Sequence, residues 1–86
     1  MINKVLVSLQ LAEIECNFDI FIPVNEVTWK IKKMLVKSIV DITDINMNEA
    51  NNYILVNKIS GKIYKNNDII IDTDIRNATE LILLSI

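Results

Sequence analysis

The sequence predicts an α+β domain in which one helix packs across one mixed sheet. Apolar and polar residues alternate over residues 4–11 and 16–22, and this period of two is typical of strands with one buried face. Residues 80–86 also read as a strand. Between these strands, residues 26–40 change to the period of an amphipathic helix. The order of two strands, one helix and further short strands indicates a single domain over residues 1–86.

The first two strands are predicted to pair as a hairpin. The apolar face of the first strand carries Val5, Val7, Leu9 and Leu11. The second strand carries Cys16, Phe18, Ile20 and Ile22 in the same phase. We therefore expect Cys16 to be a small buried side chain. Pro23 ends the second strand, because proline has no amide hydrogen to donate to a neighbouring strand.

The helix is predicted to present one apolar stripe to the sheet. At about 100° per residue, the stripe comprises Val27, Ile31, Met34, Leu35, Ser38 and Ile42. Asn25 is the predicted N-cap, since its side chain can accept hydrogen bonds from the free amides of the first turn. Residues 41–52 are polar and rich in Asn and Asp, so we expect a loop there.

Short strands are predicted at residues 53–57 and 62–64, on either side of a turn at Gly61, and a last strand at 80–86. Residues 66–68 are predicted to form another turn, because Asn and Asp tolerate the positive φ that glycine usually supplies. Residues 69–75 show no decisive period.

Composition argues against several function classes. The chain has no histidine and a single cysteine, which leaves no Ser-His or Cys-His pair and no cysteine-rich metal site. We therefore expect no catalytic residue, no metal and no cofactor. A net charge of −2 without a cluster of basic residues argues against a nucleic-acid partner. The chain shows neither a signal segment nor an apolar run of about 20 residues, so we expect a cytoplasmic protein without a transmembrane segment.

The C-terminal half carries a resemblance to a known fold family. Its matching residues are Gly61, Lys62, Ile70, Asp72, Ile75, Thr79, Leu81 and Leu83. They follow ubiquitin's pattern of G-K, L, D, I, S/T, L and L at the same spacings. The chain thus resembles the β-grasp, or ubiquitin-like, family. It departs from that pattern at Thr73, where ubiquitin has tyrosine.

A closer resemblance, over nearly the whole chain, is to the small ubiquitin-like accessory proteins of Gram-positive type VII (ESX-like) secretion systems, the YukD/EsaB type. Residues 18–23 (FDIFIP) are similar to their aromatic-D-L-x-V-P second strand, residues 35–39 (LVKSI) to the end of their helix, and residues 53–58 (YILVNK) to their third strand. Asn67, Asp68, Asp72 and Ile75 continue the match. Ala78 departs from it, because this family usually has glycine there.

The resemblance implies a non-catalytic, cytoplasmic accessory or regulatory component of a type VII secretion system. Its implied partners are membrane subunits of the secretion machine or the machine's ATPase. Ubiquitin acts through a flexible tail ending in Gly-Gly, whereas this sequence stops at Ile86 within a predicted strand. We therefore expect no conjugation to targets. Two alternatives stay open, an adaptor in another bacterial pathway and a sulfur-carrier or modifier-type protein that has lost its Gly-Gly tail.

A first candidate binding surface is the side of the sheet that faces away from the helix. With Val5, Ile54, Val56 and Leu81 assigned to the helix side, the opposite side collects Leu6, Tyr53, Leu55, Ile82 and Leu84. A sheet with one wet face should be polar there, so these side chains predict binding of a protein partner or of a second copy of the chain. The alternative is that Leu and Ile serve there only as strand-forming residues.

A second, weaker candidate lies on the helix, where Trp29, Val36 and Val40 are predicted opposite the apolar stripe, with lysines around them. A tryptophan among lysines is typical of a protein-interface anchor or of a contact with a membrane surface. The alternative, which we favour because large aromatic side chains are mostly buried, is that Trp29 packs under the loop at residues 41–52.

Overall fold

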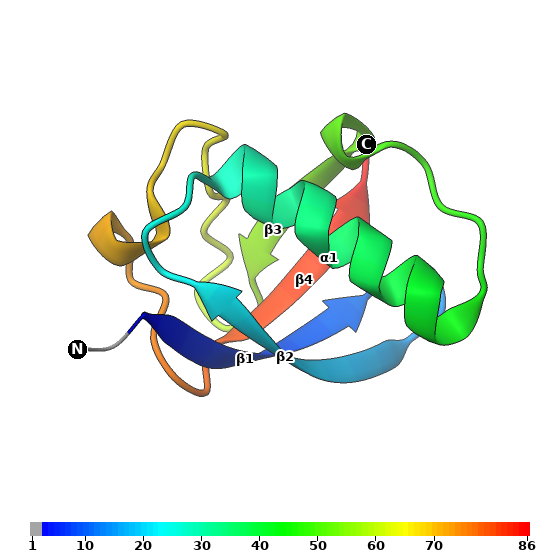
Figure 1. The fold of residues 1–86 in the computed structure, drawn as a ribbon, viewed down its shortest axis with the longest axis horizontal. Coiled ribbons are helices and arrows are strands. Elements are labelled where there is room, and N and C mark those ends of the chain that lie inside the picture. The colour runs from blue at the N-terminus through cyan, green and yellow to red at the C-terminus, as the bar shows by residue number, and fades with distance from the viewer. Residues whose placement is uncertain (1–2) are drawn as a thin grey trace.

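The computed structural model describes residues 3–86, in which one α-helix lies across one face of a four-stranded sheet (Figure 1). The strands are β1 Lys4–Leu11, β2 Cys16–Pro23, β3 Tyr53–Asn57 and β4 Glu80–Ser85. The helix is α1 Thr28–Thr43, and two short 3₁₀ helices are η1 Ala50–Asn52 and η2 Ile70–Asp72. The predicted α+β class, with one helix packed across one mixed sheet, is confirmed.

The strands follow the order β2-β1-β4-β3. β1 and β2 form the predicted antiparallel hairpin, with Val5 opposite Ile22. β4 enters the centre of the sheet parallel to β1 and antiparallel to β3. The last strand of the chain therefore lies between the first strand and the third, so that β4, like β1, has neighbours on both edges (Figure 1).

The helix begins and ends later than residues 26–40. Its N-cap is Val27, without a side-chain hydrogen bond, so the prediction of an Asn25 cap is wrong. Two carbonyls of a distant loop do the capping instead: the amide of Thr28 donates to the Asp68 carbonyl at 2.8 Å, and the amide of Trp29 donates to the Asn66 carbonyl at 3.2 Å. Because any residue can supply a carbonyl, this cap leaves no signature in the local sequence.

The core lies between the sheet and α1. Its fully buried side chains come from all four strands, the helix and the loop before β4: Leu9, Leu11, Ile22, Ile31, Leu35, Ile39, Tyr53, Leu55, Ile70, Ile75, Leu81 and Leu83. The helix is rotated relative to the predicted stripe, because it buries Lys32 and Ile39 whereas Ile42 is 65% exposed. Cys16 is also exposed, contrary to prediction, because it begins β2, an edge strand with no further strand beside it.

The phase of β3 corrects two predicted site residues. Tyr53 and Leu55 are both 0% exposed and belong to the core, so their assignment to the outer side of the sheet is wrong. Leu55 pairs with Leu83, and directly opposed residues of neighbouring strands point to the same face. β3 reads Tyr-Ile-Leu-Val, apolar in both phases, and the register with β4 therefore decides which side chains enter the core.

The free edge of β3 is partly covered by residues 62–64. The predicted strand there is reduced to a single bridge between Val56 and Ile63, supported by a bond from the Tyr64 amide to the Leu55 carbonyl at 3.0 Å. The Tyr64 ring is buried, and its hydroxyl donates to Asp74 Oδ1 at 2.6 Å and accepts from Asn57 Nδ2 at 3.2 Å. This network closes the core at one edge of the sheet.

Candidate interaction surfaces

The outer face of the sheet carries a group of aliphatic side chains over β3 and β4. Ile54 lies opposite Leu84, and Val56 lies between Ile82 on β4 and Ile63 at the edge of the sheet. We call these five residues the β3–β4 apolar face. Ile63 is 56% exposed, Ile54, Ile82 and Leu84 are half-buried, and Val56, which lies in the middle, is 8% exposed.

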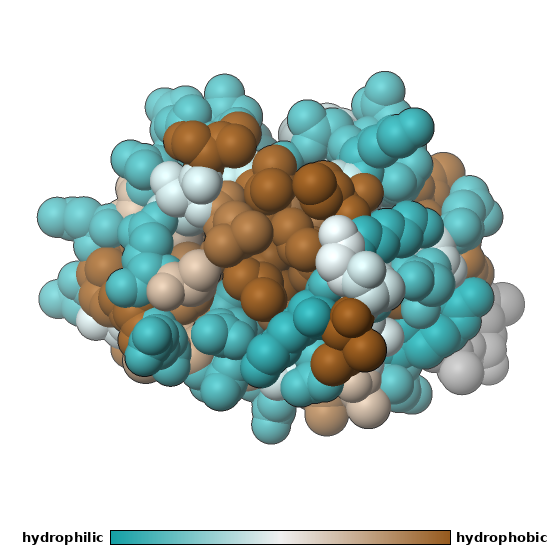
Figure 2. Space-filling view, turned by 180° about the vertical axis from the view of Figure 1, so that it is seen from behind, coloured by the Kyte–Doolittle hydropathy of each residue, from teal (hydrophilic) through white to brown (hydrophobic). Residues whose placement is uncertain are grey.

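Figure 2 views the molecule from the side opposite the helix. Hydrophobic atoms gather near the centre of this side and hydrophilic residues surround them. The five residues share one face and occupy two neighbouring rows of the sheet. They therefore form a continuous patch, although only Ile82 and Leu84 of it were predicted from the sequence.

Leu6 lies on the outer side of the sheet, as predicted, but apart from the β3–β4 apolar face. Leu6 lies opposite Phe21 of β2, and these two side chains are 38% and 61% exposed. Ser8 of β1 pairs with Glu80 of β4. This polar pair lies between the Leu6–Phe21 pair and Ile82. The row that contains Ser8 and Glu80 is polar, so Leu6 and Phe21 form a separate, smaller apolar spot. The sequence analysis did not include Phe21 in a candidate surface. The alternation of β2 shows which side of the strand Phe21 occupies, but it does not show that Leu6 lies opposite it.

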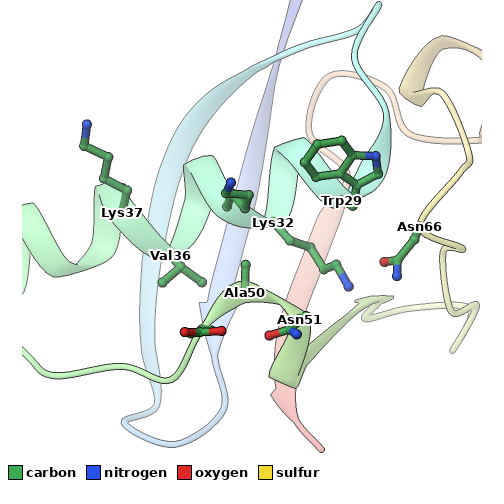
Figure 3. A pocket seen from close by; sticks show the side chains of 9 residues that line it. Trp29, Lys32, Val36, Lys37, Ala50, Asn51 and Asn66 are labelled. Carbon is green, nitrogen blue, oxygen red and sulfur yellow. The ribbon is translucent and has the colours of Figure 1, made fainter.

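A groove runs between one flank of α1 and the segment that contains η1 (Figure 3). Its volume is about 660 Å³. The residues that line this α1 groove are Trp29, Lys32, Lys33, Val36, Lys37, Glu49, Ala50, Asn51 and Asn66. Figure 3 shows Ala50 pointing up toward the helix from below, and Trp29 at the end of the groove nearest Asn66.

The three helix residues singled out from the sequence are only partly brought together. Trp29 and Val36 line the α1 groove, whereas Val40 is half-buried and lies outside its lining. Trp29 is 41% exposed, so the prediction that the loop at residues 41–52 buries it is wrong. The end of that loop reaches the groove through Glu49 and Ala50, but it forms the opposite wall and does not cover the indole.

Two lysines lie beside the indole, and a third lysine that lines the groove is buried. The ammonium groups of Lys30 and Lys33 lie 5.6 and 5.8 Å from the centroid of the Trp29 ring, within the range of cation–π attraction. Lys32 is only 5% exposed, and its Nζ donates to the Tyr53 carbonyl at 3.0 Å. Burial lowers the pKa of Lys32, because the charged form loses water. The helical pattern of the sequence gave no sign that Lys32 is buried.

Among residues 3–86, no group of three or more Asp, Glu, Cys or His side chains is placed to hold a metal ion. The two clear shifts among the tyrosines have structural causes. Burial raises the pKa of Tyr53, and burial together with the bond to Asp74 raises the pKa of Tyr64 to about 12. Over the same residues, no helix is long and apolar enough to cross a membrane.

Comparison with known proteins bears on the fold. No family model and no curated protein matches this chain. Among solved structures, an N-terminal ubiquitin-like domain solved in solution superposes with a TM-score of 0.71 at 19% identity, covering 100% of this chain and 78% of that one. A ubiquitin-like domain of an Arabidopsis thaliana protein gives 0.69 at 13% identity, covering 98% and 79%.

A chain of a toluene 4-monooxygenase complex, solved with the inhibitor 4-bromobenzoate, gives a TM-score of 0.77 at 6% identity, covering 96% of this chain and 99% of that one. Identities this low speak to the fold alone, since one fold serves many functions. The strand order, the helix across the sheet and these superpositions together establish that the chain has the ubiquitin-like, or β-grasp, fold.

Proposed function

We propose that this chain is a non-catalytic protein-interaction module that binds a protein partner through the β3–β4 apolar face. The observation that carries the proposal is the continuous patch of Ile54, Val56, Ile63, Ile82 and Leu84 on the side of the sheet without a helix. Contiguous exposed aliphatic groups rimmed by polar residues are typical of protein-binding sites. Excluding water from them favours association.

The other half of the same face argues against the reading that these residues only favour strand formation. β1 and β2 place Ser8, Gln10 and Asp19 on the outer side of the sheet, so polar side chains are compatible with this fold at equivalent positions. Five aliphatic residues cluster on β3, β4 and the segment beside them, whereas β1 contributes only Leu6 to this face. Strand propensity alone does not account for that uneven distribution.

The finer proposal is that the module is a cytoplasmic accessory or regulatory component of a type VII secretion system. Its support is the resemblance over residues 18–23, 35–39 and 53–58. The proposed partners are a membrane subunit of the secretion machine or its ATPase. An adaptor role in another bacterial pathway is the alternative. Affinity capture from a cell that carries the system separates the two, because the first role requires recovery of a secretion subunit and the second requires recovery of a different partner.

The test of the binding face is Leu84→Asp, which places a charge in the patch without touching the core. Ile42→Asp is the matched control, since Ile42 is 65% exposed on α1, in the other layer of the fold. We expect Leu84→Asp to abolish partner capture and Ile42→Asp to retain it. Circular dichroism should show both variants folded.

Unchanged capture by Leu84→Asp would rule out this face as the binding site. Sedimentation velocity of the wild-type chain tests a second use of the same patch. If the chain forms a dimer that Leu84→Asp dissociates, the occupant of the patch is a second copy of the chain. Intact-mass analysis after incubation with cell extract tests the sulfur-carrier alternative, because a covalent adduct or thiocarboxylate would contradict a purely non-covalent role.

A further inference from the structure

We infer that the α1 groove is a second binding site, and that it takes an extended segment of a partner protein in which acidic and large aliphatic residues alternate. The observations that carry this inference are the charge on α1, the unpaired lysines at the groove and the apolar surfaces between them. The inference does not depend on the β3–β4 apolar face, which lies on the other layer of the fold.

Positive charge is concentrated on α1 in a chain that is negative overall. The net charge of the chain is −2. α1 carries four of the nine basic residues, Lys30, Lys32, Lys33 and Lys37, and a single acidic residue, Asp41. The segregation gives this side of the molecule a local field opposite in sign to the net charge, and such a field attracts acidic partners.

Two of these lysines are exposed and have no ion-pair partner among residues 3–86. The single salt bridge found there joins Lys30 to Glu26 at 3.8 Å. Lys33 and Lys37 are exposed and lie four residues apart on the helix. Like charges at this spacing repel one another. A carboxylate bound between or above them removes that repulsion.

Below these charges the groove is apolar and recessed. Trp29 and Val36 on the helix and Ala50 on the opposite wall provide its apolar surface. Figure 3 shows Lys32 extending from α1 into the groove, with its nitrogen between Asn51 and Asn66. The bond to the Tyr53 carbonyl uses one of the three N–H groups of the ammonium, so the floor of the groove adds a further positive charge beneath the apolar surface.

The spacing of the lysines matches an extended peptide. Residues four apart on a helix are separated by about 6 Å along its axis, and alternate residues of an extended strand are separated by about 6.8 Å. Two acidic side chains on one side of the peptide can therefore reach Lys33 and Lys37. The residue between them points to the other side, toward Trp29 and Val36, where a leucine-sized side chain gains apolar contact.

A protein segment fits this geometry better than a lipid surface. Trp29 and Val36 lie within a groove walled by Ala50 and Asn51, and a flat bilayer surface does not enter such a groove. Glu49, the one acidic residue of the lining, lies on the wall opposite the lysines. It repels acidic groups from that side, so that the acidic side of the peptide is directed toward the helix.

Trp29 is the only tryptophan of the chain, so its fluorescence reports on the groove directly. The probe is the synthetic peptide acetyl-Leu-Glu-Leu-Glu-Leu-Glu-amide, titrated into the full chain at low salt. The matched control replaces each Glu by Gln, which keeps shape and removes charge. We expect the acidic peptide to change the Trp29 emission and to shift amide NMR signals of α1 and η1, and the Gln peptide to do neither.

Charge-reversal variants distinguish binding in the α1 groove from nonspecific electrostatic attraction of the acidic peptide to the chain. The double variant Lys33→Glu/Lys37→Glu should weaken binding of the acidic peptide by about tenfold or more at low salt. The double variant Lys4→Glu/Lys58→Glu, which changes two exposed lysines outside the groove by the same total charge, should bind within about twofold of wild type. The Leu84→Asp variant should bind the acidic peptide as wild type does. The test of the α1 groove is therefore independent of whether the β3–β4 apolar face binds a partner.

Three outcomes would overturn the inference. The first is absence of any NMR shift at α1 on addition of the acidic peptide. The second is equal binding of the acidic and Gln peptides, which would remove the role of the lysines. The third is binding of phosphatidylglycerol vesicles that changes the Trp29 emission while the peptide does not, which would assign the helix to a membrane surface.

Discussion

The two faces of β3 and β4 carry the same kinds of side chain but differ in burial. Tyr53, Leu55 and Leu83 on the inner face are fully buried, whereas Ile54 and Leu84 on the outer face stay in partial contact with water. The difference comes from what covers each face. α1 and the loop before β4 close the inner face, and no described element crosses the outer one (Figures 1 and 2).

The hydrophobicity of the sequence therefore identifies β3 and β4 as strands, but it does not show which of their two faces is left uncovered by the helix. A leucine in β3 is a core residue and a leucine in β4 belongs either to the core or to the proposed site, depending on phase. The predictions below test that distinction by perturbing the inner face, the edge that closes it and the turn that leads into β4.

The largest effect is expected from Leu55→Asp. Leu55 is 0% exposed, and burying a carboxylate there without a partner should cost about 4 kcal/mol or more, which is a large part of the stability of so small a domain. We expect an unfolded or severely destabilised chain by circular dichroism. The same substitution at Leu84 should cost less than about 1 kcal/mol. Equal destabilisation by the two substitutions would contradict the assignment of faces.

An intermediate effect is expected from Tyr64→Phe at the closed edge. The substitution keeps the buried ring but removes the hydroxyl that bonds Asp74 and Asn57. Loss of these two bonds should lower the free energy of unfolding by about 1–2 kcal/mol at neutral pH, as measured by urea denaturation. A loss below the error of that measurement would show that Asp74 and Asn57 find other partners.

The same residue predicts a sensitivity to alkaline pH. Burial, with the bond to Asp74, raises the pKa of Tyr64 to about 12, whereas an unfolded chain releases that proton near pH 10, about the ordinary pKa of tyrosine. The Tyr64 contribution is therefore fully present below pH 10 and is lost as the pH rises through about 12. Tyr64→Phe should lose less stability than wild type over this interval.

Two other groups with shifted pKa values also change the stability at alkaline pH, so the measurement has to compare wild type with Tyr64→Phe. Burial raises the pKa of Tyr53, which acts in the same direction as Tyr64, and lowers the pKa of Lys32, which acts in the opposite direction. Both groups are present in wild type and in Tyr64→Phe. The difference between the two proteins, followed from pH 9 to about pH 12 by urea denaturation, therefore isolates Tyr64.

The smallest effect is expected from Ala78→Gly in the turn before β4. Ala78 has a φ of 72°, in the left-handed region where a Cβ is unfavourable. Its amide donates to the Leu6 carbonyl at 2.8 Å, so the turn helps to hold the chain where β4 enters the sheet beside β1. Glycine should raise the free energy of unfolding by about 0.5–1 kcal/mol. A decrease would show that Ala78 does not populate this conformation.

Much of the fold was predictable because its signals are local. Alternation marked β1 and β2, and the apolar run at residues 81–84 marked β4. The predicted bounds differ from the observed ones only at Pro23 and Ile86. The switch of period marked α1, although its N-terminus was placed two residues early. The cap supplied by the carbonyls of Asn66 and Asp68 acts across about 40 residues of sequence, and no local pattern encodes it.

The candidate site was less predictable, for two reasons visible in particular residues. Ile63 belongs to the β3–β4 apolar face through a single bridge to Val56. The short irregular segment around Ile63 carries no sequence pattern that predicts this bridge. Lys32 became a buried side chain because a backbone carbonyl of β3 lies within reach of its ammonium. Both placements depend on pairings between segments, and the types of the residues do not specify them.

The order of elements, their periods and the switch between strand and helix follow from the sequence alone, because each depends on side-chain spacing within one segment. The choice between the two apolar phases of β3, and with it the membership of the β3–β4 apolar face, required the packed molecule. With Tyr, Ile, Leu and Val in succession, either phase buries comparable apolar surface. The pairing of Leu55 with Leu83 beneath α1 selects one of them, because opposed side chains must share a face and only one face is covered.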